Sequence, residues 1–264
     1  MHAFQTSFLP KTAHAGEGAA RGWRWAGLSC PKSLGDGTVQ ANDDAWFARS
    51  GDTTLDLAVV DVATQKRGIT GVAIQEILQQ TFQDADRHVS PGEILNDAHG
   101  RLLDQLKATH AKGAACLMIV RLDADGHCQW AHAGDAVLAH WQPPTTFRNS
   151  RLHLLNTRHR EGHGLTQGVG IQRESGVQFE EGMLTLAEED RLLMMTDGVF
   201  HDAMTIDGIR HWIDAHELSA DTCLPCDLVR KIEAEARFTQ PRADDSTLVL
   251  IERKPPIQGG QHAA

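Results

Sequence analysis

The amino-acid sequence predicts an α+β fold in a single domain. Three observations support this: short apolar segments recur along the chain, four segments have helical spacing, and these helical segments come in pairs between groups of strands. No stretch rich in Pro, Gly or Ser divides the 264 residues. We therefore expect one domain over residues 21–253, with flexible polar tails over residues 1–20 and 254–264.

The expected strands are apolar runs, each bounded by Gly, Asp, Asn or Pro. In chain order they are Trp23–Leu28, Ala45–Arg49, Thr54–Val60, Ala114–Leu122, Cys128–Ala133, Ala136–Trp141, Met183–Leu186, Arg191–Thr196 and Ser246–Glu252. Apolar residues at helical spacing predict helices over Gly71–Phe82 and Pro91–Thr109. Two further helical candidates, Ile206–Glu217 and Cys226–Arg237, lie before the last strand.

The overall charge argues against one class of partner. The chain has 35 Asp and Glu against 25 Lys and Arg, a formal net charge of −10. Proteins that bind nucleic acid rely on Lys and Arg to neutralise phosphates, so we expect no nucleic-acid partner. No apolar run approaches the roughly 18 residues of a membrane-spanning helix, and the N-terminal residues lack the apolar core of a secretory signal. We expect no membrane segment.

The cysteines predict a reducing compartment. Five of them are spread through the chain, an odd number that is not typical of a disulfide framework, and we place the protein in the cytoplasm. Cys223 and Cys226 form a lone Cys-x-x-Cys pair. Without a second pair at zinc-site spacing, we interpret them as incidental thiols.

Aspartates recur where expected strands meet turns. Asp44 precedes one strand, Asp61 ends another, Asp197 follows a third and Asp244 precedes the last. Side chains from distant parts of a chain can converge at strand ends, and carboxylates placed together repel unless a cation lies among them. Oxygen ligands without sulfur or imidazole suit Mg²⁺ or Mn²⁺. The alternative for any single aspartate is that it caps the backbone of a turn.

Taken in order, these segments resemble the motifs of the PPM family, the metal-dependent type 2C protein serine/threonine phosphatases, in its bacterial form. The resemblance covers residues 21–253 and depends on the order and spacing of the motifs. The segments that carry it are Asn42-Asp43-Asp44, Leu57-Ala58-Val59-Val60-Asp61, Lys112-Gly113-Ala114-Ala115-Cys116, Ala131-His132-Ala133-Gly134-Asp135-Ala136, Leu165-Thr166-Gln167-Gly168-Val169-Gly170, Thr196-Asp197-Gly198-Val199 and Asp244-Asp245-Ser246-Thr247.

The resemblance implies a β-sandwich of two antiparallel sheets flanked by pairs of α-helices, in four αββα layers, with two Mn²⁺ or Mg²⁺ ions at one edge. It implies that Asp61 bridges both ions and that Val62 binds through its backbone carbonyl. Asp197 and Asp244 correspond to ligands of the second ion, while Asp44 would act through metal-bound water. Asp61 and Asp197 would thereby hold the bridging water that attacks the phosphate.

Other positions depart from the family pattern. Asp135 corresponds to a ligand of a possible third ion, but His201 stands where the family has another Asp. Val62 replaces a glycine of the family, and Val39 stands near the position of its phosphate-binding arginine, so Arg49 or another basic residue must substitute. These departures motivate an alternative, a catalytically weak or inactive pseudophosphatase that binds phosphoproteins as a regulator.

The chemistry of the expected reaction agrees with the rest of the sequence. Phosphate monoesters hydrolyse slowly, and two divalent ions lower the pKa of a water and place positive charge against the phosphoryl oxygens. No side-chain nucleophile is then needed, and the sequence has no Cys-x₅-Arg loop and no Gly-x-Ser-x-Gly elbow. The resemblance implies a phosphorylated protein substrate and a cognate Ser/Thr kinase. His159, Glu161 and His163 do not match a metalloprotease helix and are interpreted as a solvated loop near the substrate.

Overall fold

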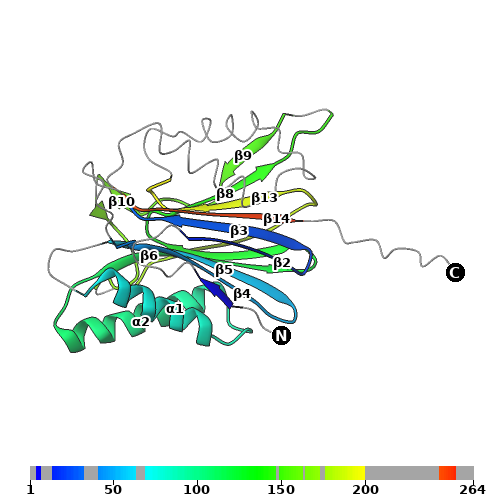
Figure 1. The fold of residues 1–264 in the computed structure, drawn as a ribbon. Coiled ribbons are helices and arrows are strands. Elements are labelled where there is room, and N and C mark those ends of the chain that lie inside the picture. Colours follow the sequence, from blue (N-terminus) through cyan, green and yellow to red (C-terminus); the bar gives the residue numbers. More distant parts are fainter. Residues whose placement is uncertain are drawn as a thin grey trace.

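The computed structural model describes residues 4–6, 14–32, 41–63, 69–146, 149–162, 164–172, 176–199 and 244–253. Two six-stranded antiparallel sheets pack face to face, and two helices cover the outer face of one of them (Figure 1). The expected α+β sandwich is confirmed. The second helix pair, over 206–217 and 226–237, lies outside the described residues, as do Cys223 and Cys226.

The first sheet, here sheet A, lies against the helices. In spatial order its strands are β1 (Phe4–Thr6), β4 (Asp44–Ser50), β5 (Thr54–Ala63), β6 (Ala114–Asp123), β7 (His127–Ala133) and β12 (Glu180–Thr185). The second, sheet B, contains β2 (His14–Ala20), β3 (Trp23–Cys30), β14 (Ser246–Arg253), β13 (Arg191–Met195), β8 (Val137–Gln142) and β9 (Arg151–Leu154). A separate hairpin consists of β10 (Arg160–Glu161) and β11 (Gly164–Leu165).

The central strands are apolar without interruption because both of their faces are buried. On β5, Leu57 and Val59 face the core between the sheets, while Ala58 and Val60 face the helices. A strand that is covered on both sides loses the polar alternation of a half-exposed strand. This explains why the continuous run Leu57-Ala58-Val59-Val60 marks a central strand.

The two helices of the first expected pair form close to their predicted bounds. Helix α1 (Gly71–Asp84) begins after Thr70, whose hydroxyl accepts the Ala73 N–H at 3.2 Å. Helix α2 (Pro91–Thr109) begins with a capping box in which Ser90 and Glu93 each bind the backbone N–H of the other. Their apolar faces pack on sheet A, which is the face that their periodicity predicts. The described helices include none long and apolar enough to cross a membrane.

The structure differs from the prediction at the N-terminus, where residues 1–20 were expected to form a tail. Strands β1 and β2 lie in this segment and pair with β4 and β3. The small residues of β2 make the segment resemble a tail, yet a Cβ at Gly18 would lie 2.8 Å from the Trp25 ring, so the small size accommodates a neighbouring indole. His14 of β2 also stacks on Trp46, with ring centroids 5.8 Å apart.

Strand bounds near the expected site also differ. β5 continues to Ala63, because Val62 and Ala63 pair with Ala115 and Ala114, so Asp61 lies within the strand and not after it. Strands β9, β10 and β11 were not predicted. They are short and mostly polar, and a run of two to four residues shows no periodicity that identifies a strand.

Candidate metal centre

Three strands of sheet A place a row of polar side chains at one end of the sandwich. Asp44 opens β4 and lies directly opposite Asp61 on β5, which in turn lies opposite Cys116 on β6. Val59, on the same face of β5 as Asp61, belongs to the core between the sheets, so the row faces sheet B. Ligand atoms of Asp61, Cys116 and Asp135 lie within 4.8 Å of one another.

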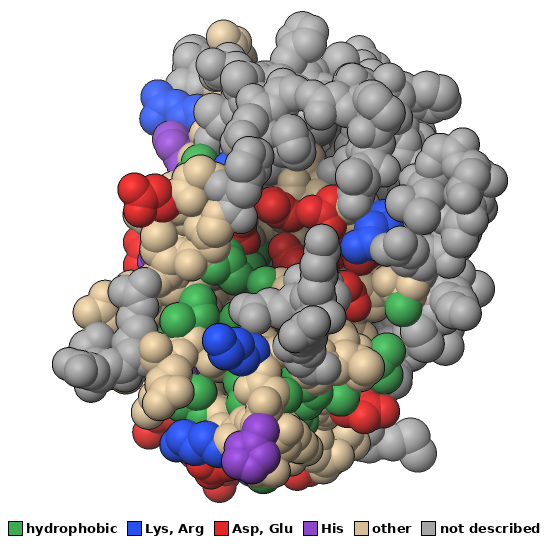
Figure 2. Space-filling model, turned by 90° about the vertical axis from the view of Figure 1, so that its left-hand side faces the viewer, with side chains coloured by type: hydrophobic (Ala, Val, Ile, Leu, Met, Phe, Trp, Pro, Cys, Tyr) green, Lys and Arg blue, Asp and Glu red, His purple; other side chains and the backbone are tan. Residues whose placement is uncertain are grey.

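Sheet B brings two more aspartates to this end. Asp197 follows β13 and Asp244 precedes β14, and the two strands pair antiparallel, so the end of one lies beside the start of the other. The charges of Asp197 and Asp244 raise the pKa of both Asp44 and Asp61. Figure 2, which views this end of the molecule, shows acidic side chains gathered in a hollow. The structure therefore brings together the four aspartates selected from the sequence.

Burial and mutual repulsion raise the pKa values of this cluster. Burial is the largest cause for Asp44 and Asp61, whose pKa values lie well above their ordinary value. The pKa of Asp197 rises to about 6 through burial and through the charges of Asp135 and Asp244. Carboxylates in this position ionise readily only when positive charge is added. Because the donors are mainly carboxylate oxygens, the set fits hard cations such as Mg²⁺ and Mn²⁺.

A hydroxyl group joins the two sheets at the cluster. Thr196 Oγ1 donates to Asp44 Oδ2 at 2.6 Å and accepts the Thr247 N–H at 2.9 Å. The backbone N–H of Asp44 donates to Asn42 Oδ1 at 3.0 Å, and Asn42 Nδ2 donates to Ser29 Oγ at 2.9 Å. Residues of both sheets thus orient Asp44. The positioning role of Thr196 was missed from the sequence, although it precedes Asp197 in the Thr-Asp-Gly motif.

Asp245, beside Asp244, binds backbone N–H groups of two other segments. It is 2% exposed, and its two carboxylate oxygens accept the backbone N–H groups of Lys32 at 2.6 Å and Asp43 at 2.9 Å. Burial raises the pKa of Asp245, while these hydrogen bonds and the nearby Lys32 ammonium oppose the rise. Asp245 therefore holds the segment that leads into Asp44, a role that the sequence did not reveal.

The Gly-Asp hairpin brings Asp135 to the cluster. Cys116 Sγ donates to Asp135 Oδ1 at 2.8 Å and accepts the Asp135 N–H at 3.3 Å. Gly134 is required here, because it has φ +128° and its Cβ would lie 2.5 Å from Cys116. Burial, with the charges of Asp61 and Asp135, raises the pKa of the Cys116 thiol well above its ordinary value, so it is a neutral neighbour and not a thiolate.

Arg160 is a basic residue that lies in the cluster. Its Nη1 is 3.5 Å from Asp197 Oδ2 and 3.6 Å from Asp135 Oδ2. Arg49, the candidate named from the sequence, does not take this position: it lies at the other end of β4, with Nη2 2.8 Å from Asp56 Oδ2. Arg160 escaped sequence reasoning because only the hairpin fold carries it to the acidic end. His201 and Val39 lie outside the described residues.

Val62 is accommodated without the glycine of the family pattern. It continues β5, its N–H donates to the Asp43 carbonyl at 3.1 Å, and its side chain is buried in the helix-side core. It is not among the described residues with positive φ, so this backbone does not demand glycine. The use of its carbonyl as a metal ligand stays a prediction.

The segment that precedes β10 is packed and not a solvated loop. His159 is half-buried, its ring centroid lies 4.9 Å from that of His132, and its N–H donates to the Gly134 carbonyl at 2.7 Å. The interpretation of His159 as a solvated residue was therefore wrong. The reason is tertiary, since β7 and the Gly-Asp hairpin cover it. His163 lies outside the described residues.

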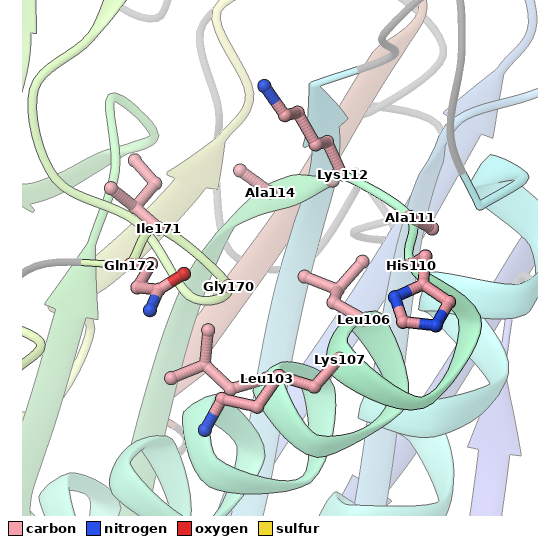
Figure 3. A pocket seen from close by; sticks show the side chains of 11 residues that line it. Leu103, Leu106, Lys107, His110, Ala111, Lys112, Ala114, Gly170, Ile171 and Gln172 are labelled. Carbon is pink, nitrogen blue, oxygen red and sulfur yellow. The ribbon is translucent and has the colours of Figure 1, made fainter.

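A second hollow of about 570 Å³ lies between the end of α2, the start of β6 and residues 170–172 (Figure 3). Leu103, Leu106 and Ile171 line it together with Lys107 and Lys112. Among the described residues that line it there is no carboxylate side chain and no member of the acidic cluster.

Comparison with known proteins identifies the family. The model of the family described as Stage II sporulation protein E (SpoIIE) matches residues 51–254, most of the chain. The chain belongs to this family. The resemblance to bacterial PPM phosphatases is thereby confirmed, and the described sandwich is the fold of a PPM-type phosphatase. No curated protein sequence matches the chain.

Solved structures share this fold at low sequence identity. PppA, a regulatory component of the type VI secretion system (T6SS) in Pseudomonas aeruginosa, is 15% identical, with a TM-score of 0.67 over 87% of this chain and 97% of that chain. The serine/threonine phosphatase PstP/Ppp of Mycobacterium tuberculosis is 15% identical, with a TM-score of 0.62 over 88% and 99%. The catalytic domain of PstP in complex with 2 manganese ions is 14% identical, with a TM-score of 0.63 over 88% and 99%.

Proposed function

We propose that this protein is a metal-dependent protein serine/threonine phosphatase that uses Mn²⁺ or Mg²⁺. The observation that carries the proposal is the convergence of Asp44, Asp61, Asp197 and Asp244 in a hollow where burial and repulsion raise the pKa of three of them. Buried carboxylates with raised pKa values destabilise the folded protein when they ionise, and this arrangement is typical of a functional site where cations bind. Membership of the family and the manganese-bound PstP structure support this choice.

The roles follow from the arrangement. Asp61, central in the row on sheet A, would bind both ions, with the Val62 carbonyl beside it. Asp197 and Asp244 would hold the second ion from sheet B, and Asp44 would act through water. When bound, the ions supply positive charge for the phosphoryl oxygens and lower the pKa of a water. A third ion would use Asp135 and His201.

The chain contributes two further groups. The Arg160 guanidinium, already within 3.6 Å of Asp135 and Asp197, suits bidentate binding of phosphoryl oxygens at the edge of the cluster. Thr196 holds Asp44 in one orientation through its hydroxyl. We propose a phosphorylated protein as substrate, with a Ser/Thr kinase acting in the opposite direction, in the cytoplasm.

A second candidate is the pseudophosphatase. The observation in its favour is the same Arg160, which supplies a positive charge to Asp135 and Asp197 without any ion. In such a protein the guanidinium would substitute for a metal, and the hollow would bind a phosphoprotein without hydrolysing it.

One experiment separates the two. Chelator-treated protein is assayed on a phosphothreonine peptide with and without Mn²⁺, while calorimetry measures Mn²⁺ binding. Asp197→Asn should abolish turnover, and the matched variant Asp104→Asn, on the exposed side of α2, should keep it. Mn²⁺ binding without turnover would refute the proposed phosphatase activity. The absence of both Mn²⁺ binding and turnover in the folded wild-type protein would refute the metal centre and support the pseudophosphatase.

A further inference from the structure

A second group of potential ligands lies beside the acidic cluster. His132 on β7, His159 before β10 and Glu180 at the start of β12 each offer a ligand atom, and these atoms lie within 4.8 Å of one another. We propose that these three residues bind a divalent transition-metal ion of the zinc type. Two imidazoles and one carboxylate make a donor set typical of zinc, in contrast to the oxygen-rich acidic cluster.

The backbone already holds the three side chains together. His132 and Glu180 are direct partners in the β7–β12 register, so their side chains leave the sheet on the same face. His159 is anchored on both sides: its N–H donates to the Gly134 carbonyl at 2.7 Å and its carbonyl accepts the Thr166 N–H at 2.9 Å. Ligands that are preorganised in this way need little reordering when an ion binds.

The imidazoles are neutral near pH 7, which is the form that binds metals. Burial, reinforced by the charge of His159, lowers the pKa of His132 to about 3. Burial also lowers the pKa of His159, although Glu180 and Asp135 oppose the effect. Two neutral rings and the Glu180 side chain thus offer three lone-pair donors to a cation.

Long hydrogen bonds hold the two rings in the ion-free structure. The Gly134 N–H donates to His159 Nδ1 at 3.3 Å, and Asn156 Nδ2 lies 3.2 Å from His132 Nδ1. Glu180 keeps one carboxylate oxygen on the Thr157 N–H at 2.7 Å and has its second oxygen to offer. An ion that bound through these nitrogens would displace only these long hydrogen bonds. Access is open because His159 and Glu180 are partly exposed, whereas His132 forms the floor.

Such an ion would tie the base of the β10–β11 hairpin to sheet A. Arg160 follows His159 directly and reaches Asp135 and Asp197. Binding at His159 would thus fix the segment that carries this guanidinium. The proposal does not depend on phosphatase activity, because it concerns only binding of the ion and order of the segment.

The test titrates chelator-treated full-length protein with Zn²⁺ by calorimetry, in excess Mg²⁺ to reduce Zn²⁺ binding at the acidic cluster. His159→Asn and Glu180→Gln each remove one ligand while nearly keeping side-chain size. The controls are His153→Asn and Glu181→Gln, since both residues are exposed and Glu181 points to the other face of β12. We expect the ligand variants to bind Zn²⁺ more than about tenfold more weakly, because changes to outer residues alone cost that much at metal sites.

A spectroscopic measurement distinguishes metal binding at the proposed site from metal binding by the other histidines. Co²⁺ in place of Zn²⁺ should give ligand-field absorption in the wild type and both controls, and His159→Asn and Glu180→Gln should lose it. Circular dichroism checks that each variant folds. Equal Zn²⁺ affinity and equal Co²⁺ absorption in all five proteins would overturn the proposal.

Discussion

Substituting Asp197 by Asn should stabilise the metal-free protein while it removes metal-dependent activity. The ordinary pKa of this carboxyl is 3.8, and burial with the charges of Asp135 and Asp244 raises it to about 6. The folded state therefore retains a proton that the unfolded chain has already released. Asparagine has the same shape without the ionisable group, so it avoids the cost of ionisation in the folded cluster.

The magnitude follows from the difference in pKa. One pKa unit corresponds to about 1.4 kcal/mol, so ionised Asp197 destabilises the metal-free fold by about 3 kcal/mol above pH 6. Below pH 3.8 the carboxyl is protonated in both states and the penalty vanishes. The advantage of the variant should thus be absent near pH 3.5, grow between pH 3.8 and the folded pKa of about 6, and be complete by about pH 8.

The assay is urea unfolding in chelator, followed by tryptophan fluorescence at pH 5 and pH 8, with Asp104→Asn as the control. With Mn²⁺ at about 100 times its dissociation constant the wild type should gain about 2.7 kcal/mol, and Asp197→Asn should gain much less. If Asp197→Asn were no more stable than wild type at pH 8 in chelator, the reasoning about the cluster would be refuted.

Three further substitutions test other contacts. Asp56→Asn leaves two buried guanidinium groups without their counter-charge and should lower the free energy of unfolding, measured with urea, by about 3–5 kcal/mol. As the control, Asp97→Asn removes an exposed ion pair and should lower it by less than about 1 kcal/mol. Equal losses in the two variants would contradict this prediction. Thr196→Val removes the hydrogen bond to Asp44 and should lower kcat at least about tenfold, since such bonds contribute about 1.5–3 kcal/mol; an unchanged kcat would exclude the role. Ser90→Ala removes the capping box of α2 and should cost about 1 kcal/mol in thermal unfolding, so an unchanged Tm would argue against it.

Much of the fold could be predicted because capping residues and apolar spacing within each segment indicate its secondary structure. Helix α2 has its start signal in Ser90 and Glu93 and its apolar face in the sequence, and both survive in the structure. Strand β2 could not be predicted in the same way. Its Gly18 lies against Trp25 on the neighbouring strand, and that neighbour is known only after the sheet is formed.

Some residues of the candidate site could likewise be predicted from the sequence, and others could not. The four aspartates could be selected from the sequence because each lies in a motif at or near the start or end of a strand, and the order of the motifs was informative. Arg49 was named and Arg160 was missed because nothing local distinguishes a guanidinium that closes a structural ion pair from one that faces the cluster.

The amino-acid sequence thus specifies the apolar runs that form the central strands of two sheets, the helices that cover one of the sheets, and the aspartates available for a metal centre. The groups that surround those aspartates follow from the folded arrangement: Thr196 against Asp44, Asp245 against the backbone, and Arg160 against Asp197. The reason is that strand periodicity is a property of neighbouring residues, whereas these contacts join residues far apart in the chain. The folded structure also shows where part of the −10 net charge lies: acidic side chains gather at one end of the sandwich, where cations would bind.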